Sequence, residues 1–189
     1  NDIDEKTVAA ASVTYLEGYL WEPAMAKEAF LKATDISHAK GKDVALSLSD
    51  TFCVDRHRAD FQRLISDHVD IVFANEAEIC ALYKAKDFDV AIEELRGRCK
   101  VAALTRGAKG SVIIAGEELL VVDPEPVDLL VDTTGAGDAY AAGFLYGFSQ
   151  SKNLATCASI GSIIASEIIQ HIGARPDRPL KGLVASRTE

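Results

Sequence analysis

The sequence predicts an α/β protein built around a mostly parallel sheet. Strand and helix patterns alternate through the first half of the chain, which is typical of parallel strands joined by helices. The largely apolar run Val69–Ala74 is short and suits a strand buried on both faces. A glycine turn, Asp132–Asp138, then lies between an apolar run and a segment of small residues, as at a strand–helix junction.

Each element of the first half follows from periodicity and its breaks. Helical spacing of Phe61, Leu64 and Ile65, with charges between them, predicts one of the helices, and Gly41 ends another. We expect three strands, at Ser12–Leu20, Val44–Ser49 and Val69–Ala74. We expect four helices, at Ala24–Ala39, Arg56–His68, Glu76–Tyr83 and Val90–Arg98.

The second half carries a different pattern. Three short strands, at Val101–Thr105, Ser111–Ala115 and Glu118–Val122, are separated by glycines, which predicts a small antiparallel addition. We expect a further strand in the apolar run Val127–Val131, and then helices at Asp138–Phe148 and Leu154–His171. No repeat or linker is visible in the 189 residues, so a single domain is the simplest organisation.

Composition limits the classes of function. The chain has 20 Lys and Arg residues against 29 Asp and Glu residues, and a net charge of −9 argues against nucleic-acid binding. No apolar run or leader suggests a membrane partner. The cysteines are far apart, which disfavours a zinc site and favours reduced thiols in the cytoplasm. The chain begins at Asn1 rather than at Met, so we expect it to be a fragment or a processed product.

The segment from Asp132 to Asp138 reads Asp-Thr-Thr-Gly-Ala-Gly-Asp. Glycines before a helix let backbone N–H groups approach an anion, and the helix N-terminus adds open donors and positive partial charge. Asp138 would then be a base beside a phosphate. The alternative is tight-turn geometry with a carboxylate that compensates the helix dipole. Tyr140 stands where a dinucleotide-binding turn needs a small residue, and no Walker A pattern occurs.

Two further motifs follow predicted strands. Asn75 can cap a helix with Glu78 at the reciprocal position of a capping box. The run from Thr105 to Gly110, Thr-Arg-Gly-Ala-Lys-Gly, reads on its own as a glycine hairpin turn. Because ligands bind at the carboxyl ends of parallel strands, Asn75, Thr105 and Asp132 should meet at one edge of the sheet.

The run Asp132–Leu145 resembles the C-terminal signature of the PfkB, or ribokinase-like, sugar and nucleoside kinases. This resemblance implies a ribokinase-like three-layer α/β/α fold with the N-terminal part of the domain absent. It also implies that Asp138 is the catalytic base. The backbone amides of Gly135, Ala136 and Gly137 would form an anion hole for the transferred phosphoryl group.

The resemblance assigns roles to the other motifs as well. It implies that Asn75 and Glu78 organise Mg²⁺ and the phosphates, largely through water. It implies that Thr105, Gly107 and Gly110 lie along the nucleotide. The cofactors would be ATP and Mg²⁺, while a monovalent cation and a homodimer are left open. A helix of small residues near Ser162 would face adenine, although close helix packing explains these residues well and is the default interpretation. Ser162 stands where the family usually has His or Asn.

The implied function is phosphoryl transfer from ATP to a hydroxymethyl group of a small sugar or nucleoside. Segments near Gly18 and Gly173 resemble the adenosine-kinase-like branch. A ribokinase- or fructokinase-type sugar kinase, and a non-catalytic nucleotide-binding regulator on the same fold, are alternatives. A Rossmann-type oxidoreductase is a third alternative, which Tyr140 disfavours. The absent N-terminal part would carry most of the acceptor-binding residues, so the fragment alone could be inactive.

Overall fold

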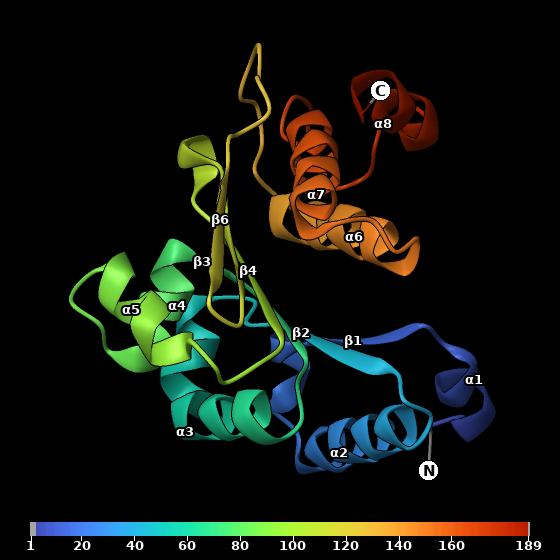
Figure 1. The fold of residues 1–189 in the computed structure, drawn as a ribbon, viewed down its shortest axis with the longest axis vertical. Helices are drawn as coiled ribbons and strands as arrows, with labels where there is room; N and C mark the ends of the chain where they lie inside the picture. The colour runs from blue at the N-terminus through green and yellow to red at the C-terminus, as the bar shows by residue number, and fades with distance from the viewer. Residues whose placement is uncertain (1–2, 189) are drawn as a thin grey trace. The chain divides into compact units, whose positions relative to one another are not determined.

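The computed structural model describes residues 3–188 and shows an α/β fold (Figure 1). Six strands form one sheet in the order in which they occur along the chain. They are β1 (Val13–Glu17), β2 (Asp43–Ser47), β3 (Ile71–Asn75), β4 (Val101–Thr105), β5 (Ser111–Ala115) and β6 (Glu118–Val122). The helices are α1 (Glu5–Ala10), α2 (Ala24–Ala39), α3 (Thr51–Asp67), α4 (Glu76–Tyr83), α5 (Phe88–Leu95), α6 (Ala136–Ser149), α7 (Leu154–Ile168) and α8 (Leu180–Thr188).

The sheet is parallel where helices connect its strands. β1 pairs with β2 from Val13↔Asp43 to Glu17↔Ser47, and β2 pairs with β3 in the same direction. The link from β5 to β6 is too short for a parallel crossover, so these strands form an antiparallel hairpin. The predicted parallel sheet with a small antiparallel addition is therefore confirmed.

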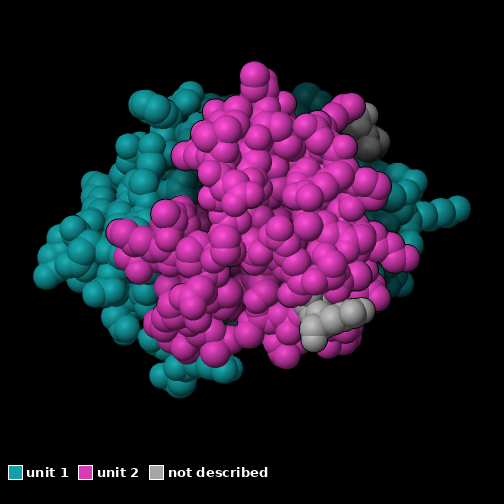
Figure 2. Space-filling view, turned by 90° about the horizontal axis from the view of Figure 1, so that it is seen from above, with its two compact units in different colours: residues 1–104, 114–118 teal, residues 105–113, 119–189 magenta. Residues whose placement is uncertain are grey.

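The chain divides into two compact units, which Figure 2 colours separately. Unit 1 comprises residues 1–104 and 114–118, and unit 2 comprises residues 105–113 and 119–189. Unit 1 holds α1 to α5 and the first strands of the sheet. Unit 2 holds the 105–110 turn, the segment that follows β6, and α6 to α8.

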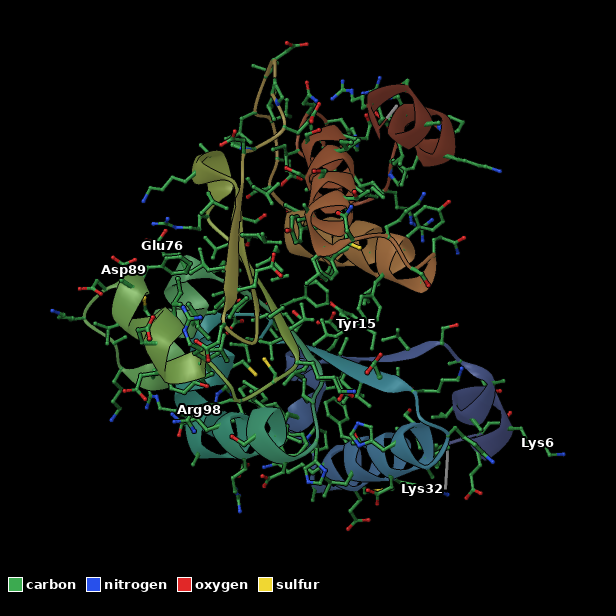
Figure 3. The ribbon with its side chains drawn as sticks, viewed as in Figure 1. Lys6, Tyr15, Lys32, Glu76, Asp89 and Arg98 are labelled. Atoms are coloured by element: carbon green, nitrogen blue, oxygen red, sulfur yellow. The ribbon has the colours of Figure 1, made fainter. Side chains whose placement is uncertain are left out.

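Unit 1 has a tightly closed apolar core. α2 packs on β1 and β2, α3 packs on α4, and α4 packs on α5. The ring centroids of Tyr15, on β1, and Phe73 lie 6.3 Å apart, and Arg98 lies over the ring of Tyr83. Figure 3 labels Tyr15 and Arg98. The largest fully buried side chains of this unit are Leu46, Leu48, Phe61, Ile65, Ile71, Ile79, Leu82, Leu95 and Leu104.

Unit 2 is organised by the close approach of α6 and α7. A Cβ atom on Gly143 would lie 2.8 Å from the Cα of Gly161, and one on Gly147 would lie 3.1 Å from the Cα of Cys157. Only glycine lets the two helices come this close. α8 adds Leu180, Leu183 and Val184 to the apolar cluster on α7, so the C-terminal helix completes the core of this unit.

Most of the predicted boundaries agree with the structure, and the exceptions have local causes. The first strand ends at Glu17 rather than Leu20, because a 3₁₀ turn, Gly18–Trp21, follows it. α3 begins at Thr51, before the predicted Arg56, because the Asp50 side chain accepts a hydrogen bond from the N–H of Cys53 and caps the helix there. α7 ends at Ile168, before the predicted His171.

The predicted strand at Val127–Val131 was wrong. No strand occurs between residues 123 and 135, and the side chains of Leu129 and Leu130 are about two-thirds exposed, at 65% and 63%. The N–H groups of Val131 and Asp132 both donate to the carbonyl oxygen of Ile169 instead of to a neighbouring strand. An apolar run forms a strand only where a partner strand satisfies its backbone, and none lies beside this run among the described residues.

Candidate active site

Asn75 and Glu78 form the expected capping box at the start of α4. The N–H of Glu78 donates to Asn75 Oδ1 at 2.9 Å, and the N–H of Asn75 donates to Glu78 Oε2 at 2.9 Å. The Asn75 side-chain amide also donates to Glu78 Oε1 at 2.6 Å. Both carboxylate oxygens of Glu78 are thus held by one residue at the carboxyl end of β3.

Glu78 is the buried member of a group of carboxylates in unit 1. Burial raises the pKa of Glu78, and the negative charges of Asp50 and Glu17 raise it further, against the lowering effect of the Asn75 N–H. Glu17 ends β1, Asp50 follows β2, and Asn75 ends β3. Three neighbouring strands of unit 1 therefore bring polar groups to the same edge of the sheet.

Hydrogen bonds tie the ends of β1 and β2 together in this group. Ser49 Oγ donates to Glu17 Oε2 at 3.1 Å and accepts from the N–H of Tyr19 at 3.2 Å. The Tyr19 side chain is also hydrogen-bonded to Asp50. Ser49 adopts a φ of 70°, an unfavourable backbone conformation for a non-glycine residue that is found preferentially at functional sites.

Sequence reasoning missed Glu17, Tyr19, Ser49 and Asp50 as members of the candidate site. A signal for Asp50 was available, because it follows the predicted strand Val44–Ser49 as Asn75 follows Val69–Ala74. Glu17 gave no such signal, because it lies inside the predicted strand Ser12–Leu20 and becomes a strand end only in the structure. The positive φ of Ser49 and the pairing of Tyr19 with Asp50 left no trace in the residue pattern, since they arise from how β1 and β2 end side by side.

The carboxylates fit a hydrated magnesium ion better than a tightly caged one. No cluster of three or more His, Cys, Asp or Glu side chains within residues 3–188 is arranged to hold a metal directly. Mg²⁺ commonly keeps several waters and uses few carboxylates, with substrate phosphates as further ligands. Glu78, Asp50 and Glu17 would hold the ion through water, and its charge would offset the repulsion between these carboxylates, which adds to the effect of burial on the pKa of Glu78.

The raised pKa of Glu78 predicts a pH-dependent effect of Glu78→Gln on stability. An acid whose pKa rises on folding stabilises the folded state most below its unfolded pKa, near 4.5, and this contribution is lost as pH rises through the folded pKa. The neutral amide has no such loss. We expect the free energy of unfolding of Glu78→Gln to increase relative to that of the wild type as pH rises through this range. Urea unfolding from pH 4 to pH 8 would measure this difference. A difference that stays constant with pH would contradict the assignment.

In unit 2, Asp132 shapes the glycine turn. Its carboxylate accepts from the N–H of Thr134 and from the N–H of Gly173, each at 2.9 Å. These two bonds lower the pKa of Asp132, the Gly173 bond most. A Cβ atom on Gly135 would lie 2.5 Å from the Cβ of Ala174. The turn is therefore held against residues 173–174 by a side chain on one side and by close packing on the other.

Gly135 is the N-cap of α6, with a left-handed φ of 76° and no side-chain cap. Asp138 lies exposed in the first helical turn. The N–H groups of Gly137 and Asp138 have no acceptor among the described residues, as expected for the first turn of an uncapped helix. The expected donor at Ala136 differs, because its N–H donates to the Thr133 carbonyl at 3.1 Å. In this structure the open donors are thus centred on Gly137, beside the Asp138 carboxylate.

The turn that precedes β5 gives its two glycines different roles. Gly107 is exposed, and a Cβ atom there would meet no atom within 4 Å, so a ligand could approach it. Gly110 is buried with a φ of 79°, and a Cβ atom there would lie 2.1 Å from the Val122 carbonyl oxygen. Internal packing explains the glycine at 110. The nucleotide contacts expected of Thr105, Gly107 and Gly110 stay predictions.

Ser162 lies on α7 and is partly buried. Its Oγ accepts a hydrogen bond from the N–H of Glu125 at 3.1 Å. The side chain therefore holds the segment that follows β6 against α7. Its predicted contact with adenine stays a prediction, and the hydroxyl already has this structural partner.

Within each unit the structure brings predicted residues together. Asn75 and Glu78 join in unit 1, and Gly135, Ala136, Gly137 and Asp138 share the start of α6 in unit 2. The expectation that Asn75, Thr105 and Asp132 meet at one edge extends over both units and stays a prediction. Its premise is corrected for Asp132, which closes no strand.

Two solved structures share the fold over nearly the whole chain. A probable sugar kinase from Rhizobium etli matches 99% of the chain with a TM-score of 0.97 and 44% identity. An adenosine kinase from Sinorhizobium meliloti matches 99% of the chain with a TM-score of 0.94 and 46% identity. In both comparisons the chain corresponds to 57% of the other protein. The α/β fold class is confirmed by these likenesses.

Sequence comparison agrees with the structural one. A cytidine kinase from Thermococcus kodakarensis is 35% identical over 144 residues, which are 73% of this chain and 51% of that protein. The chain spans about half the length of the curated relatives it matches. The family described as pfkB family carbohydrate kinase matches residues 1–181. With this match over nearly all of its length, the chain belongs to the pfkB family of carbohydrate kinases.

Proposed function

We propose that the protein transfers a phosphoryl group from ATP to a hydroxymethyl group of a nucleoside or a sugar. The observation that carries this proposal is the start of α6, where an exposed carboxylate, Asp138, stands beside open backbone donors at Gly137. A base next to an anion-binding helix terminus is the combination that phosphoryl transfer needs, since catalysis of this reaction is mostly positioning and electrostatic stabilisation.

The chain's own residues would perform distinct tasks. Asp138 orients the acceptor hydroxyl and takes its proton. The backbone donors around Gly137 stabilise negative charge on the phosphoryl oxygens, with Gly135 providing the turn that exposes them. Glu78, with Asp50 and Glu17, would hold a hydrated Mg²⁺, which would supply positive charge to the phosphates of the ATP substrate.

We favour a nucleoside such as adenosine as the acceptor. Two of the similar proteins described above are nucleoside kinases by name, the cytidine kinase and the adenosine kinase. In unit 1, Tyr19, Leu20 and Phe52 are exposed where β1 and β2 end, beside the carboxylate group. Exposed aromatic and apolar side chains suit a planar base better than the hydroxyl-covered surface of a sugar.

The 189 residues would form the C-terminal part of one ribokinase-like kinase domain that carries the ATP site and the catalytic base. The order of the three motifs along the chain supports this arrangement.

No helix within the described residues is both long and apolar enough to cross a bilayer. The cysteines of the described residues are thiols, not disulfides, which supports a reducing, cytoplasmic setting.

The proposed function is tested by ADP release from ATP·Mg²⁺. The complete protein that carries this chain would be assayed with adenosine, other nucleosides, ribose and fructose. We expect turnover with a nucleoside. Turnover with ribose or fructose alone would make the protein a sugar kinase. ATP binding with no turnover on any acceptor would instead favour a non-catalytic nucleotide-binding regulator.

A further inference from the structure

A buried pair of hydroxyl groups in unit 2 lies next in sequence to two turns, residues 105–110 and 132–138. The Tyr140 hydroxyl donates a hydrogen bond to Ser111 Oγ at 2.8 Å, and the two residues are only 4% and 2% exposed. Tyr140 lies in α6, two residues after Asp138. Ser111 begins β5 directly after Gly110. One bond therefore joins the helix that carries Asp138 to the strand that leaves the 105–110 turn.

The donor in this pair stays protonated at any physiological pH. Burial raises the pKa of Tyr140 to about 12, against a smaller lowering effect of the bond to Ser111. A buried hydroxyl that loses its partner is costly because water cannot replace the bond. The bond is thus a constant feature of the folded unit, with no pH at which it is released in a cell.

The Tyr140 ring has little freedom to move. A Cβ atom on Gly161 would lie 2.8 Å from the Tyr140 carbonyl oxygen and 3.1 Å from two ring carbons, so α7 presses directly on the ring. Phe144, one turn further along α6, stacks beside it with ring centroids 6.4 Å apart. The position of the hydroxyl is therefore set by the packing of α6 on α7.

The 105–110 turn, which precedes Ser111, is held in shape by its own backbone hydrogen bonds. The N–H of Arg106 donates to the Gly110 carbonyl at 2.8 Å, and the N–H of Gly110 donates to the Gly107 carbonyl at 3.1 Å. Gly110 itself packs against the Val122 carbonyl. A shift of Ser111 would consequently move the whole turn, because the residues between Arg106 and Gly110 form one compact loop.

We infer that Tyr140 is a positioning residue for phosphoryl transfer, which holds the base-bearing start of α6 at a fixed distance from the 105–110 turn through Ser111. This inference rests on the proposed function, in which the turn lies along the nucleotide and Asp138 meets the acceptor. Tyr140 touches neither ligand. Its hydroxyl fixes the spacing of the two groups that do, and small errors in such spacing are known to slow reactions strongly.

The kinetic test uses Tyr140→Phe, which keeps the ring and its packing but removes the donor. In the complete protein we expect kcat to fall about 10- to 100-fold, the scale of a small misplacement, while KM for ATP changes less than about twofold. Ser111→Ala should cause a similar fall, and the double variant no greater fall than the worse single variant, because both substitutions break the same bond. Tyr146→Phe, in the same helix but half exposed, is the matched control and should leave kcat unchanged.

Amide hydrogen exchange tests the connection without any turnover. Tyr140→Phe should speed exchange at Gly110, and Ser111→Ala should speed exchange at Ala136, each on the far side of the broken bond. Three results would overturn the inference. The first is unchanged exchange at both amides, and the second is an unchanged kcat in the single variants. The third is a double variant in which the kcat losses of the single variants multiply. A wild type that turns over no acceptor would refute the proposed function, and the exchange rates would still decide whether the pair couples the two turns. If Tyr140→Phe fails to fold, Ser111→Ala alone carries both measurements.

Discussion

Replacement of Asp138 by asparagine is expected to abolish phosphoryl transfer and to leave nucleotide binding intact. The amide cannot take the acceptor proton, and loss of a general base typically lowers the rate by about 10²–10⁴-fold. The side chain is exposed, so the variant should fold normally. The measurement is ADP release with the preferred acceptor, together with ATP binding by calorimetry.

The matched control for this substitution is Asp128→Asn. Asp128 is also an exposed aspartate of unit 2, but it lies in the loop that precedes the glycine turn. The control should retain wild-type turnover. Near-normal turnover in Asp138→Asn would refute the role of Asp138 as the base, whereas loss of ATP binding in that variant would show that the carboxylate serves the nucleotide site instead.

The second large effect is expected for Gly135→Ala. A side chain at this position faces two penalties, because the backbone φ of 76° is unfavourable for alanine and the new Cβ would lie 2.5 Å from the Cβ of Ala174. The turn must shift, and the donors at the start of α6 shift with it. Loss of one well-placed donor costs about 10²–10³-fold in rate, so we expect a fall in kcat of that order.

A second substitution separates the two causes. Ala174→Gly in the Gly135→Ala background removes the closest contact and leaves the backbone strain, so we expect partial recovery of kcat. Gly182→Ala, where a Cβ atom would meet nothing within 4 Å, is the control and should leave kcat unchanged, while alanine within α8 favours the helix. Full activity in Gly135→Ala would show that the turn tolerates a side chain and that the donor geometry does not depend on it.

Much of the fold could be read from local patterns. α2, α4 and the strands β4, β5 and β6 occur at the predicted residues, and the Asn75–Glu78 capping box forms as expected. These features depend on residues within a few positions of one another. Periodicity, caps and turn glycines report such short-range interactions directly.

The predictions that failed concern residues whose backbone partners depend on the tertiary structure. The apolar run Val127–Val131 has the composition of a strand but no neighbouring strand among the described residues, so its backbone bonds to Ile169 instead. Ala136, expected as an open donor, is satisfied by Thr133 in a turn whose shape depends on Asp132 and Gly173. The bond from Ala136 to Thr133 is local, but the segment and the turn are held by contacts between residues about forty positions apart, Val131 with Ile169 and Asp132 with Gly173.

The amino-acid sequence by itself determined the fold class, the order of most elements and the identity of the candidate base. The alternating periodicity and the glycine turn depend only on residues that are close together in the sequence. Only the tertiary structure decided which groups surround them. It buried Glu78 and brought Asp50 and Glu17 near it, which together raise the pKa of its carboxyl, and it paired the hydroxyl of Tyr140 with that of Ser111. Such partners are chosen by strand register and helix packing, which depend on the whole folded chain rather than on any local segment.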